Sequence, residues 1–286
     1  MLNLSEIKYH INSVEKTRQI TSAMELISVA KMKKATQKYE NNLTYFKKVR
    51  HTIKDILEHS PELSHKYLTH RAGKRTVYVV IASDKGMAGD YNHNVLNMAW
   101  AHMQNVETKY VFTIGQMARE FFAKNGQTVD MEYMHTIQNP TLDDARGITE
   151  NIIEMYDNNL FDEVLVCFTR EYSMAKQEPM IIKLLPVESK DFDDVVVDSD
   201  YSGTIEYEPS RRDVLNLLVP QYIVGTLYGC LVQSVASEHL KRMTAMSNAT
   251  KNADEMLEGL KIDYNKARQE KITNELTEII AGANMR

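Results

Sequence analysis

The stretch from Leu4 to Glu58 contains neither glycine nor proline. These two residues interrupt helices most strongly, so a stretch of this length without either predicts one continuous helix. At a rise of about 1.5 Å per residue, such a helix reaches roughly 80 Å, which exceeds the diameter of an ordinary domain. A helix that long gains its stability from packing rather than from propensity, so the sequence calls for a partner helix.

Apolar and small side chains recur in this stretch at alternating spacings of four and three residues. This is the seven-residue repeat of a left-handed coiled coil. The positions are Ile7, Ile11, Val14, Arg18, Thr21, Glu25, Ser28, Met32, Ala35, Tyr39, Asn42, Phe46, Val49, Ile53 and Ile56. The four from Arg18 to Ser28 are polar or small, which weakens packing but fixes the register of the two helices.

The partner helix lies at the other end of the chain, from about Ser210 to Ala283. Its repeat comprises Met243, Met246, Thr250, Ala253, Leu257, Leu260, Tyr264 and Ala267, followed by a set shifted by one residue, Ile272, Leu276, Ile279 and Ala283. Two terminal helices separated by an insert pack most simply as an antiparallel pair. The pattern alone also allows two shorter helices folded onto a single domain.

The insert has the pattern of an α/β domain. Strands are predicted at 75–83, 109–115, 163–170 and 179–187, and helices near 92–105, 116–125 and 141–158. Strands that alternate with helices favour a mostly parallel sheet. We therefore expect an α/β fold with a long antiparallel coiled coil, in three segments: a helix over 1–60, an inserted domain over 61–208 and a helix over 209–286.

The segment SDKGMAGDYN (83–92) follows a predicted strand, a position where many proteins bind phosphate. It has glycines at Gly86 and Gly89 but lacks the G-x-x-x-x-G-K-[ST] and G-x-G-x-x-G arrangements. Asp84 and Asp90 would repel phosphate oxygens. We expect a structural turn here and no cofactor.

Other chemistry-bearing patterns are absent from the sequence. The histidines between 51 and 70 match no zinc spacing, and the acidic segment 191–200 lacks the calcium-loop spacing. Cys167 and Cys230 lie in apolar runs, which predicts buried thiols in a reducing compartment. We expect no catalytic residue, no cofactor and no metal.

Charge and hydropathy restrict the partners. Residues 1–60 carry 11 Lys and Arg against 6 Asp and Glu, which suits nucleic acid, a membrane surface or an acidic protein face. Acidic residues interrupt the basic ones and few aromatic residues are available for stacking, so we expect a protein partner and no nucleic acid. The chain opens with no signal or transit peptide, and no window approaches 18 uncharged apolar residues, so we expect no direct insertion into lipid.

The two ends of the chain carry a resemblance to a known family. They read KTRQITSAMELISVAKMKKA (16–35), SEHLKRMTAMSNATKNADEM (237–256) and YNKARQEKITNELTEIIAGA (264–283). Together with SDKGMAGDYN, EPMIIKLLP (178–186) and YEPSRRDVLNLLVPQYIVG (207–225), they resemble the gamma subunit of F-type ATP synthase from about residue 4 to residue 283. The sequence departs from the family pattern at Ser22, Met87-Ala88, Asp90, Lys251 and Ala253-Asp254-Glu255, and the changes in the loop leave the helical motifs intact.

The resemblance implies a Rossmann-like insert and the role of a central rotor shaft, a non-catalytic subunit of a proton- or sodium-translocating complex. The implied partners are the alpha and beta subunits of the catalytic hexamer, the epsilon subunit and the membrane c-ring, with one copy per complex. The implied place is the cytoplasmic face of a bacterial plasma membrane, as a peripheral protein. The residues that the resemblance assigns to coupling with partners are Met24, Lys31, Lys34, Arg242, Gln269 and Thr273.

Two other classes remain open from the residues alone. One is a soluble nucleotide-binding α/β enzyme with helical arms, and the other is a tethering coiled coil without a motor role. Nucleotide binding by the isolated chain favours the first. Extraction of an ATPase complex that contains the chain excludes both.

Overall fold

A computed structural model describes residues 4–60, 62–174, 176–195 and 207–284. The chain divides into two compact units, one of Met1–Val29 with Arg242–Arg286 and one of Ala30–Lys241. Two long helices, α1 (Leu4–Glu58) and α5 (Arg211–Asn284), contribute to both units. The predicted long helices are therefore confirmed, and the alternative of two short helices is wrong.

A five-stranded sheet forms the centre of the Ala30–Lys241 unit. The strands are β1 (Arg75–Ile81), β2 (Thr108–Ile114), β3 (Met131–Tyr133), β4 (Glu163–Ser173) and β5 (Lys176–Leu185), in the order β3-β2-β1-β4-β5. The first four strands run parallel to one another, whereas β5 pairs antiparallel with β4. The prediction of a mostly parallel sheet is confirmed, although it missed the three-residue β3.

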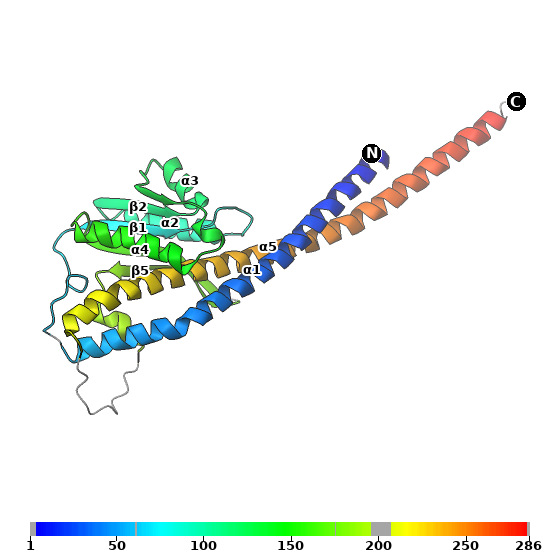
Figure 1. Ribbon diagram of the computed structural model, residues 1–286. Coiled ribbons are helices and arrows are strands. Elements are labelled where there is room, and N and C mark those ends of the chain that lie inside the picture. Colours follow the sequence, from blue (N-terminus) through cyan, green and yellow to red (C-terminus); the bar gives the residue numbers. More distant parts are fainter. Residues whose placement is uncertain (1–3, 61, 175, 196–206, 285–286) are drawn as a thin grey trace. The chain divides into compact units, whose positions relative to one another are not determined.

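Helices cover both faces of this sheet, which explains why its central strands read as continuous apolar runs (Figure 1). Side chains alternate between the faces along a strand, so Tyr78 and Val80 pack with α2 (Tyr91–Met103) and α3 (Gln116–Lys124). Val77 and Val79 lie in the opposite core with α4 (Leu142–Asp157) and with the parts of α1 and α5 that belong to this unit. Two short 3-10 helices, η1 (Thr136–Gln138) and η2 (Ser189–Phe192), complete the unit.

The hydropathy of α5 corrects one expectation. The helix contains an 18-residue window with a mean hydropathy of 1.4, apolar enough by composition to cross a membrane. However, 56% of that window is buried inside the protein. Leu215, Ile223 and Leu231 of this region lie in the core beside the sheet, so the apolar run is explained by the fold itself.

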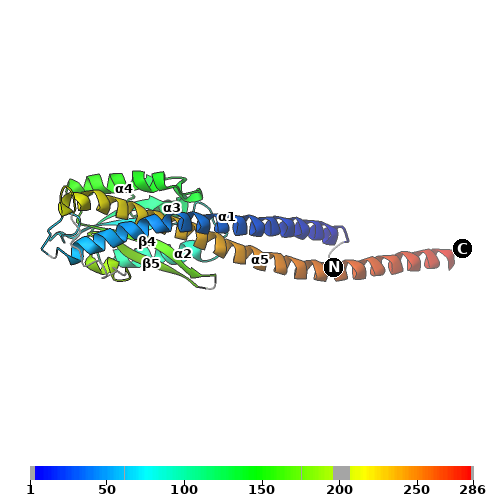
Figure 2. The ribbon, with the colours of Figure 1, turned by 60° about the horizontal axis from the view of Figure 1, so that its bottom comes forward.

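In the other unit, the first turns of α1 and the second half of α5 form an antiparallel helix pair, and α5 continues past the beginning of α1 (Figure 2). The Thr21 and Thr250 hydroxyls are 2.8 Å apart, and Arg18 pairs with Asp254. The lower-numbered residue of α1 thus meets the higher-numbered residue of α5, as expected for antiparallel helices. The predicted repeat is confirmed, because Ile7, Met246, Ala253 and Leu257 are buried in it, as is Ser28. The shifted set is different, since Ile272, Leu276 and Ile279 are exposed.

The helix ends can be compared with the three predicted segments. α1 ends at Glu58 and α5 begins at Arg211, each within two residues of the segment boundaries at 60 and 209. The two compact units instead divide both long helices near Val29 and Arg242. Part of the acidic segment 191–200 lies outside the described residues.

Candidate functional site

Side-chain hydrogen bonds hold the turn after β1 in place. The Asn92 side-chain oxygen accepts hydrogen bonds from the Ser83 backbone N–H (3.0 Å) and the Ser83 hydroxyl (2.9 Å). One Asp84 oxygen accepts from the backbone N–H of Gln116, the first residue of α3, at 3.1 Å, and the other accepts from the Gln138 side chain at 2.8 Å. The Asp84 carboxylate therefore occupies the start of α3, the helix that follows β2.

The second aspartate of the turn is tied to α5. Asp90 lies 2.9 Å from the Lys241 ammonium and also accepts a hydrogen bond from Asn94. The Lys241 ammonium lowers the pKa of Asp90, because it stabilises the ionised carboxylate. The residue that departs from the family pattern at this position is thus an anchor for the loop on the helix.

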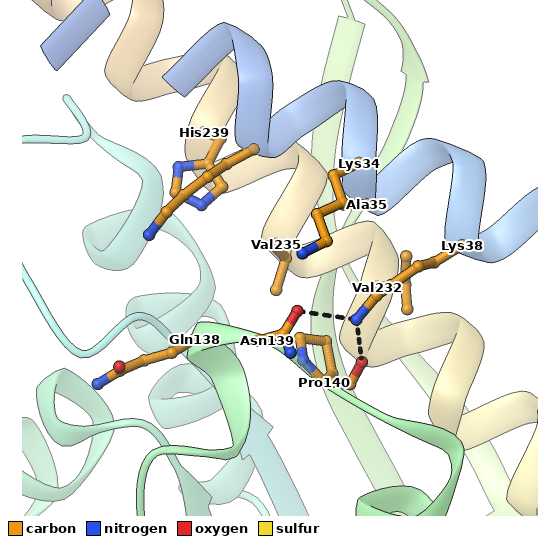
Figure 3. Close-up of a pocket in the computed structure, with 10 residues that line it drawn as sticks. Lys34, Ala35, Lys38, Gln138, Asn139, Pro140, Val232, Val235 and His239 are labelled. Atoms are coloured by element: carbon orange, nitrogen blue, oxygen red, sulfur yellow. Dashed lines mark hydrogen bonds between the residues drawn. The ribbon is translucent and has the colours of Figure 1, made fainter. Parts of the chain in front are cut away.

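A cavity of about 270 Å³ lies between α1, α5 and the segment that follows η1 (Figure 3). Its lining comprises Lys31, Lys34, Ala35 and Lys38 of α1, Gln138, Asn139 and Pro140, and Val232, Val235 and His239 of α5. The Lys38 ammonium donates to the Asn139 side-chain oxygen at 2.8 Å and to the Pro140 carbonyl at 3.1 Å, which holds the loop against α1 (Figure 3). Two of the predicted coupling residues, Lys31 and Lys34, therefore lie together at one pocket.

The surroundings of this pocket disfavour the charged form of Lys38. Partial burial lowers the pKa of Lys38, and the neighbouring Lys34 ammonium lowers it further, while Asp144 acts in the opposite direction. His239 is only 7% exposed. The ammonium groups of Lys31, Lys34 and Lys38 concentrate positive charge at the pocket.

Met24 and Arg242 belong to the helix-pair unit. Met24 is half-buried, and its carbonyl accepts a 2.7 Å hydrogen bond from the Ser28 hydroxyl one turn later. Arg242 is 8% exposed. Both residues therefore take part in the packing of the pair, and neither presents a fully free side chain.

Gln269 and Thr273 are both exposed on the part of α5 that extends past α1. The Thr273 hydroxyl donates to the Gln269 carbonyl at 2.9 Å, which places the two residues one turn apart on the same side of the helix. The structure thus separates the six predicted residues into three groups: a pair at the cavity, a packed pair, and an exposed pair.

Sequence reasoning missed Lys38, His239 and the residues 138–140. The spacing of Lys31, Lys34 and Lys38 by three and four residues places them on one side of a helix, and that signal was available. The approach of His239 and of the loop depends on long-range packing, which no local pattern reports.

Several other sequence expectations concern reactive side chains. Cys167 and Cys230 are buried and unbridged, as predicted, and burial raises the pKa of both thiols, to about 12 for Cys230. Among the residues that the structure describes, no group of three or more His, Cys, Asp or Glu side chains could hold a metal ion.

Comparison with known proteins gives concordant matches along the whole chain. A family model described as ATP synthase matches residues 3–285. The chain is 43% identical to the ATP synthase gamma chain of Ruminiclostridium cellulolyticum, over 99% of this chain and 98% of the relative. It is 42% identical to the ATP synthase gamma chain of Acetivibrio thermocellus, over 99% of both chains.

Solved structures agree in fold. A chain in the central stalk and c-ring structure of the mitochondrial ATP synthase of Tetrahymena thermophila superimposes with a TM-score of 0.62 at 22% identity. The match covers 80% of the present chain and 99% of the other. At this identity the likeness concerns the fold alone.

Proposed function

Because the chain belongs to the ATP synthase gamma chain family, we propose that it is the shaft that transmits rotation between a membrane ion-driven ring and the three catalytic sites of an alpha/beta hexamer. It is a non-catalytic central-stalk rotor subunit of a membrane-associated complex. The observation that carries the proposal is the antiparallel helix pair with its extended α5.

The mechanism follows from a mismatch of symmetry. Three equivalent sites that surround one asymmetric shaft cannot all meet the same side of it. The shaft therefore biases the open and closed states of each site differently, and turning it exchanges those states in order. Nucleotide binding and rotation are thereby coupled, and the coupling is reciprocal.

The size of the coupling sets a mechanical requirement. Shifting the ratio of open to closed states of one catalytic site from 1:99 to 99:1 requires that the shaft favour one state over the other by about 5.5 kcal/mol. One elementary charge that crosses a potential of 100 mV supplies about 2.3 kcal/mol. Several ions must therefore contribute to each step, and the shaft has to deliver their sum without its two helices slipping.

Register-fixing contacts in the helix pair support this requirement. The Thr21–Thr250 hydrogen bond and the Arg18–Asp254 ion pair match one position of α1 to one position of α5. Slippage by a single turn would break both contacts. We retain the division into segments 1–60, 61–208 and 209–286 as the functional one, with the insert between the two shaft helices.

The coupling residues remain part of the proposal. We assign Met24, Arg242, Gln269 and Thr273 to contacts with the sleeve of alpha and beta subunits, and Lys31 and Lys34 to an acidic face of a partner. The apolar side chains of Ile272, Leu276 and Ile279 are exposed on α5. They support the proposal that this part of the helix turns against an apolar surface of the partner subunits.

The remaining partners are assigned from family membership. We propose contacts with the epsilon subunit and with the membrane c-ring, one copy of the chain per complex, and a position on the cytoplasmic face of a bacterial plasma membrane. No contact with nucleic acid and no insertion into lipid are part of the proposal.

Purification of the complex tests the proposal. A tag on a peripheral subunit should extract one copy of this chain with an ATPase, and removal of the chain should uncouple ATP hydrolysis from ion pumping. Recovery of a complete, coupled enzyme without the chain would refute the rotor role.

A comparison of two single substitutions tests the coupling residues in the assembled complex. Gln269→Ala should lower ATP synthesis with assembly unchanged, because the exposed side chain makes no packing contribution within the pair. Glu270→Ala, the neighbouring exposed position, serves as the matched control. Equal effects of the two substitutions would remove Gln269 from the coupling surface.

A further inference from the structure

The cavity between α1, α5 and the 138–140 segment differs in composition from two other cavities of the described residues. Its charged and titratable lining consists of Lys31, Lys34, Lys38 and His239, and no carboxylate lines it. A cavity between the first turns of α1 and the middle of α5 contains Glu15, Asp254 and Glu258 beside its two cations. A third, near the start of β1, contains Glu107, Asp162 and Glu163. Only the first of these three cavities therefore concentrates charge of a single sign.

The arrangement of donors makes this charge available to a ligand. Two of the three Lys38 ammonium protons are used by Asn139 and Pro140, so the ammonium is fixed in place with one proton left. Lys34 points into the same space (Figure 3). No carboxylate of the described residues forms an ion pair with Lys31 or Lys34.

We propose that this cavity binds a small anion of the phosphate class, held by Lys31, Lys34 and Lys38 with Gln138 at the rim. Three ammonium groups suit a doubly charged oxyanion, because charge-assisted hydrogen bonds to phosphate oxygens are short and strong. Such an anion would also relieve the mutual repulsion of the lysines. Every residue of the site belongs to the Ala30–Lys241 unit, and titration of the chain alone tests the site apart from the rotor role, in which the exposed ends of Lys31 and Lys34 are proposed to meet an acidic partner face.

The shape of the cavity favours a small anion over a protein segment. Its volume of about 270 Å³ lies near the lower limit of small-molecule sites, and Ala35, Val232 and Val235 form its apolar lining. Lys38 and His239 are recessed, half-buried and buried respectively. A compact oxyanion can reach the recessed ammonium group, whereas an acidic peptide would meet mainly the exposed tips of Lys31 and Lys34.

Calorimetric titration of the full chain with inorganic phosphate, pyrophosphate and glycerol 3-phosphate, at low ionic strength in a zwitterionic buffer, tests the proposal. We expect saturable binding with one site per chain, tighter for pyrophosphate than for phosphate. The titration with glycerol 3-phosphate distinguishes a site for free inorganic anions from a site for a phosphoryl group on a larger molecule. The double variant Lys31→Gln/Lys34→Gln should weaken binding by at least about tenfold, because two charge-assisted hydrogen bonds are lost.

Lys33→Gln is the matched control, since Lys33 is exposed on the same turn of α1 and does not line the cavity. It removes one positive charge, half of what the double variant removes, and should leave the affinity unchanged within about twofold. Circular dichroism confirms that all variants fold. Equal weakening by Lys33→Gln would reduce the effect to general electrostatic attraction, and binding of an acidic peptide with none of the three anions would assign the surface to a protein partner; either result overturns the proposal.

Discussion

Individual carboxylates hold the loops of the α/β unit in place. Asp162 accepts two hydrogen bonds from the Arg75 guanidinium, at 2.9 and 2.8 Å, and a third from the Arg75 backbone N–H. Asp130 accepts from the Val111 N–H at 2.7 Å. Each carboxylate satisfies backbone donors at the edge of an element, where the regular ladder of hydrogen bonds ends. These acidic residues are therefore structural, which accounts for part of the acidic composition of the insert.

Asp84 offers the clearest test at this scale. Asp84→Ala removes the acceptors for the Gln116 N–H and the Gln138 side chain, and we expect a loss of about 1 kcal/mol in the free energy of unfolding. Asp84→Asn keeps one oxygen acceptor and should lose less than half of that. Urea denaturation of the full chain measures both. Equal stability of the Ala variant and the parent would contradict the capping role.

The Glu188 carboxylate predicts a dependence of stability on pH. The Lys183 ammonium, 2.7 Å away, and the Lys190 ammonium lower the pKa of Glu188 to about 2 from an ordinary value of 4.5. A lowered pKa in the folded state means that the stabilisation is complete above the ordinary value and is lost as pH falls from 4.5 towards 2.

Lys183→Gln should therefore reduce this acid sensitivity. With the carboxylate 14% exposed, we expect the parent to lose about 1 kcal/mol more than the variant between pH ~6 and pH ~3. Denaturation curves at the two pH values measure the difference. Lys176→Gln, at an exposed ion pair, is the control and should follow the parent.

The amino-acid composition of each part of α5 follows from the structure that the part packs against. The first part of α5 has Leu215, Ile223 and Leu231 in the core of the α/β unit and carries no charged residue from 214 to 237. The later part contacts a single helix, so one seam is apolar and the remaining surface is charged. One helix thus changes from the composition of a core helix to that of a coiled coil along its length.

Two glycines of α5 should respond oppositely to the same substitution. A Cβ at Gly225 would lie 2.1 Å from the Phe46 ring, whereas a Cβ at Gly259 would meet no atom within 4 Å. Gly259→Ala should stabilise the chain by about 0.5–1 kcal/mol through helix propensity. Gly225→Ala should destabilise it by about 1 kcal/mol, because overpacking exceeds the gain in propensity.

Thermal unfolding of both variants measures the opposite signs. Adding Phe46→Leu to Gly225→Ala should recover most of the loss, since the smaller side chain vacates the space. If both glycine variants stabilise the chain to the same extent, the close approach of α1 and α5 at Gly225 does not exist in solution.

The elements that were predicted correctly are those whose hydrophobic pattern lies within one continuous stretch of sequence. The seven-residue repeat gave the buried seam of α1, and the apolar runs gave β1, β2, β4 and β5. β3 escaped because three residues at the edge of a sheet carry no detectable period. The parallel or antiparallel direction of β5 depends on the length and path of its turn, which the run itself does not encode.

The candidate site was predicted less completely than the fold. Lys31 and Lys34 were singled out through a family resemblance, yet their common cavity depends on Lys38, His239 and the loop near Asn139. These groups are separated by about one hundred residues or more in sequence and meet only through tertiary packing. Spacing within one helix can therefore indicate a charged face, but it cannot supply the opposite wall of a pocket.

On the scale of the whole molecule, both units depend on the same two helices. The insert interrupts the shaft only in sequence, because residues on either side of it return to form the pair of α1 with α5. Torque applied to one helix of such a pair passes to the other through the seam. The rotor role therefore makes a mechanical demand: the two helices turn as one body.

A reversible cross-link between the helices tests this demand in the assembled enzyme. The Thr21 and Thr250 hydroxyl oxygens are 2.8 Å apart, so cysteines at both positions are placed to form a disulfide of about 2.05 Å. Cys167 and Cys230 are buried with raised thiol pKa values and will not compete. Thr21→Cys/Thr250→Cys should synthesise ATP at the same rate oxidised and reduced, because the bond fixes two residues that already move together. Thr21→Cys alone controls for the loss of the hydroxyl. A large loss of synthesis on oxidation, restored by a reductant, would show that the helices slide against each other during the cycle, and the shaft would then not be a single rigid body.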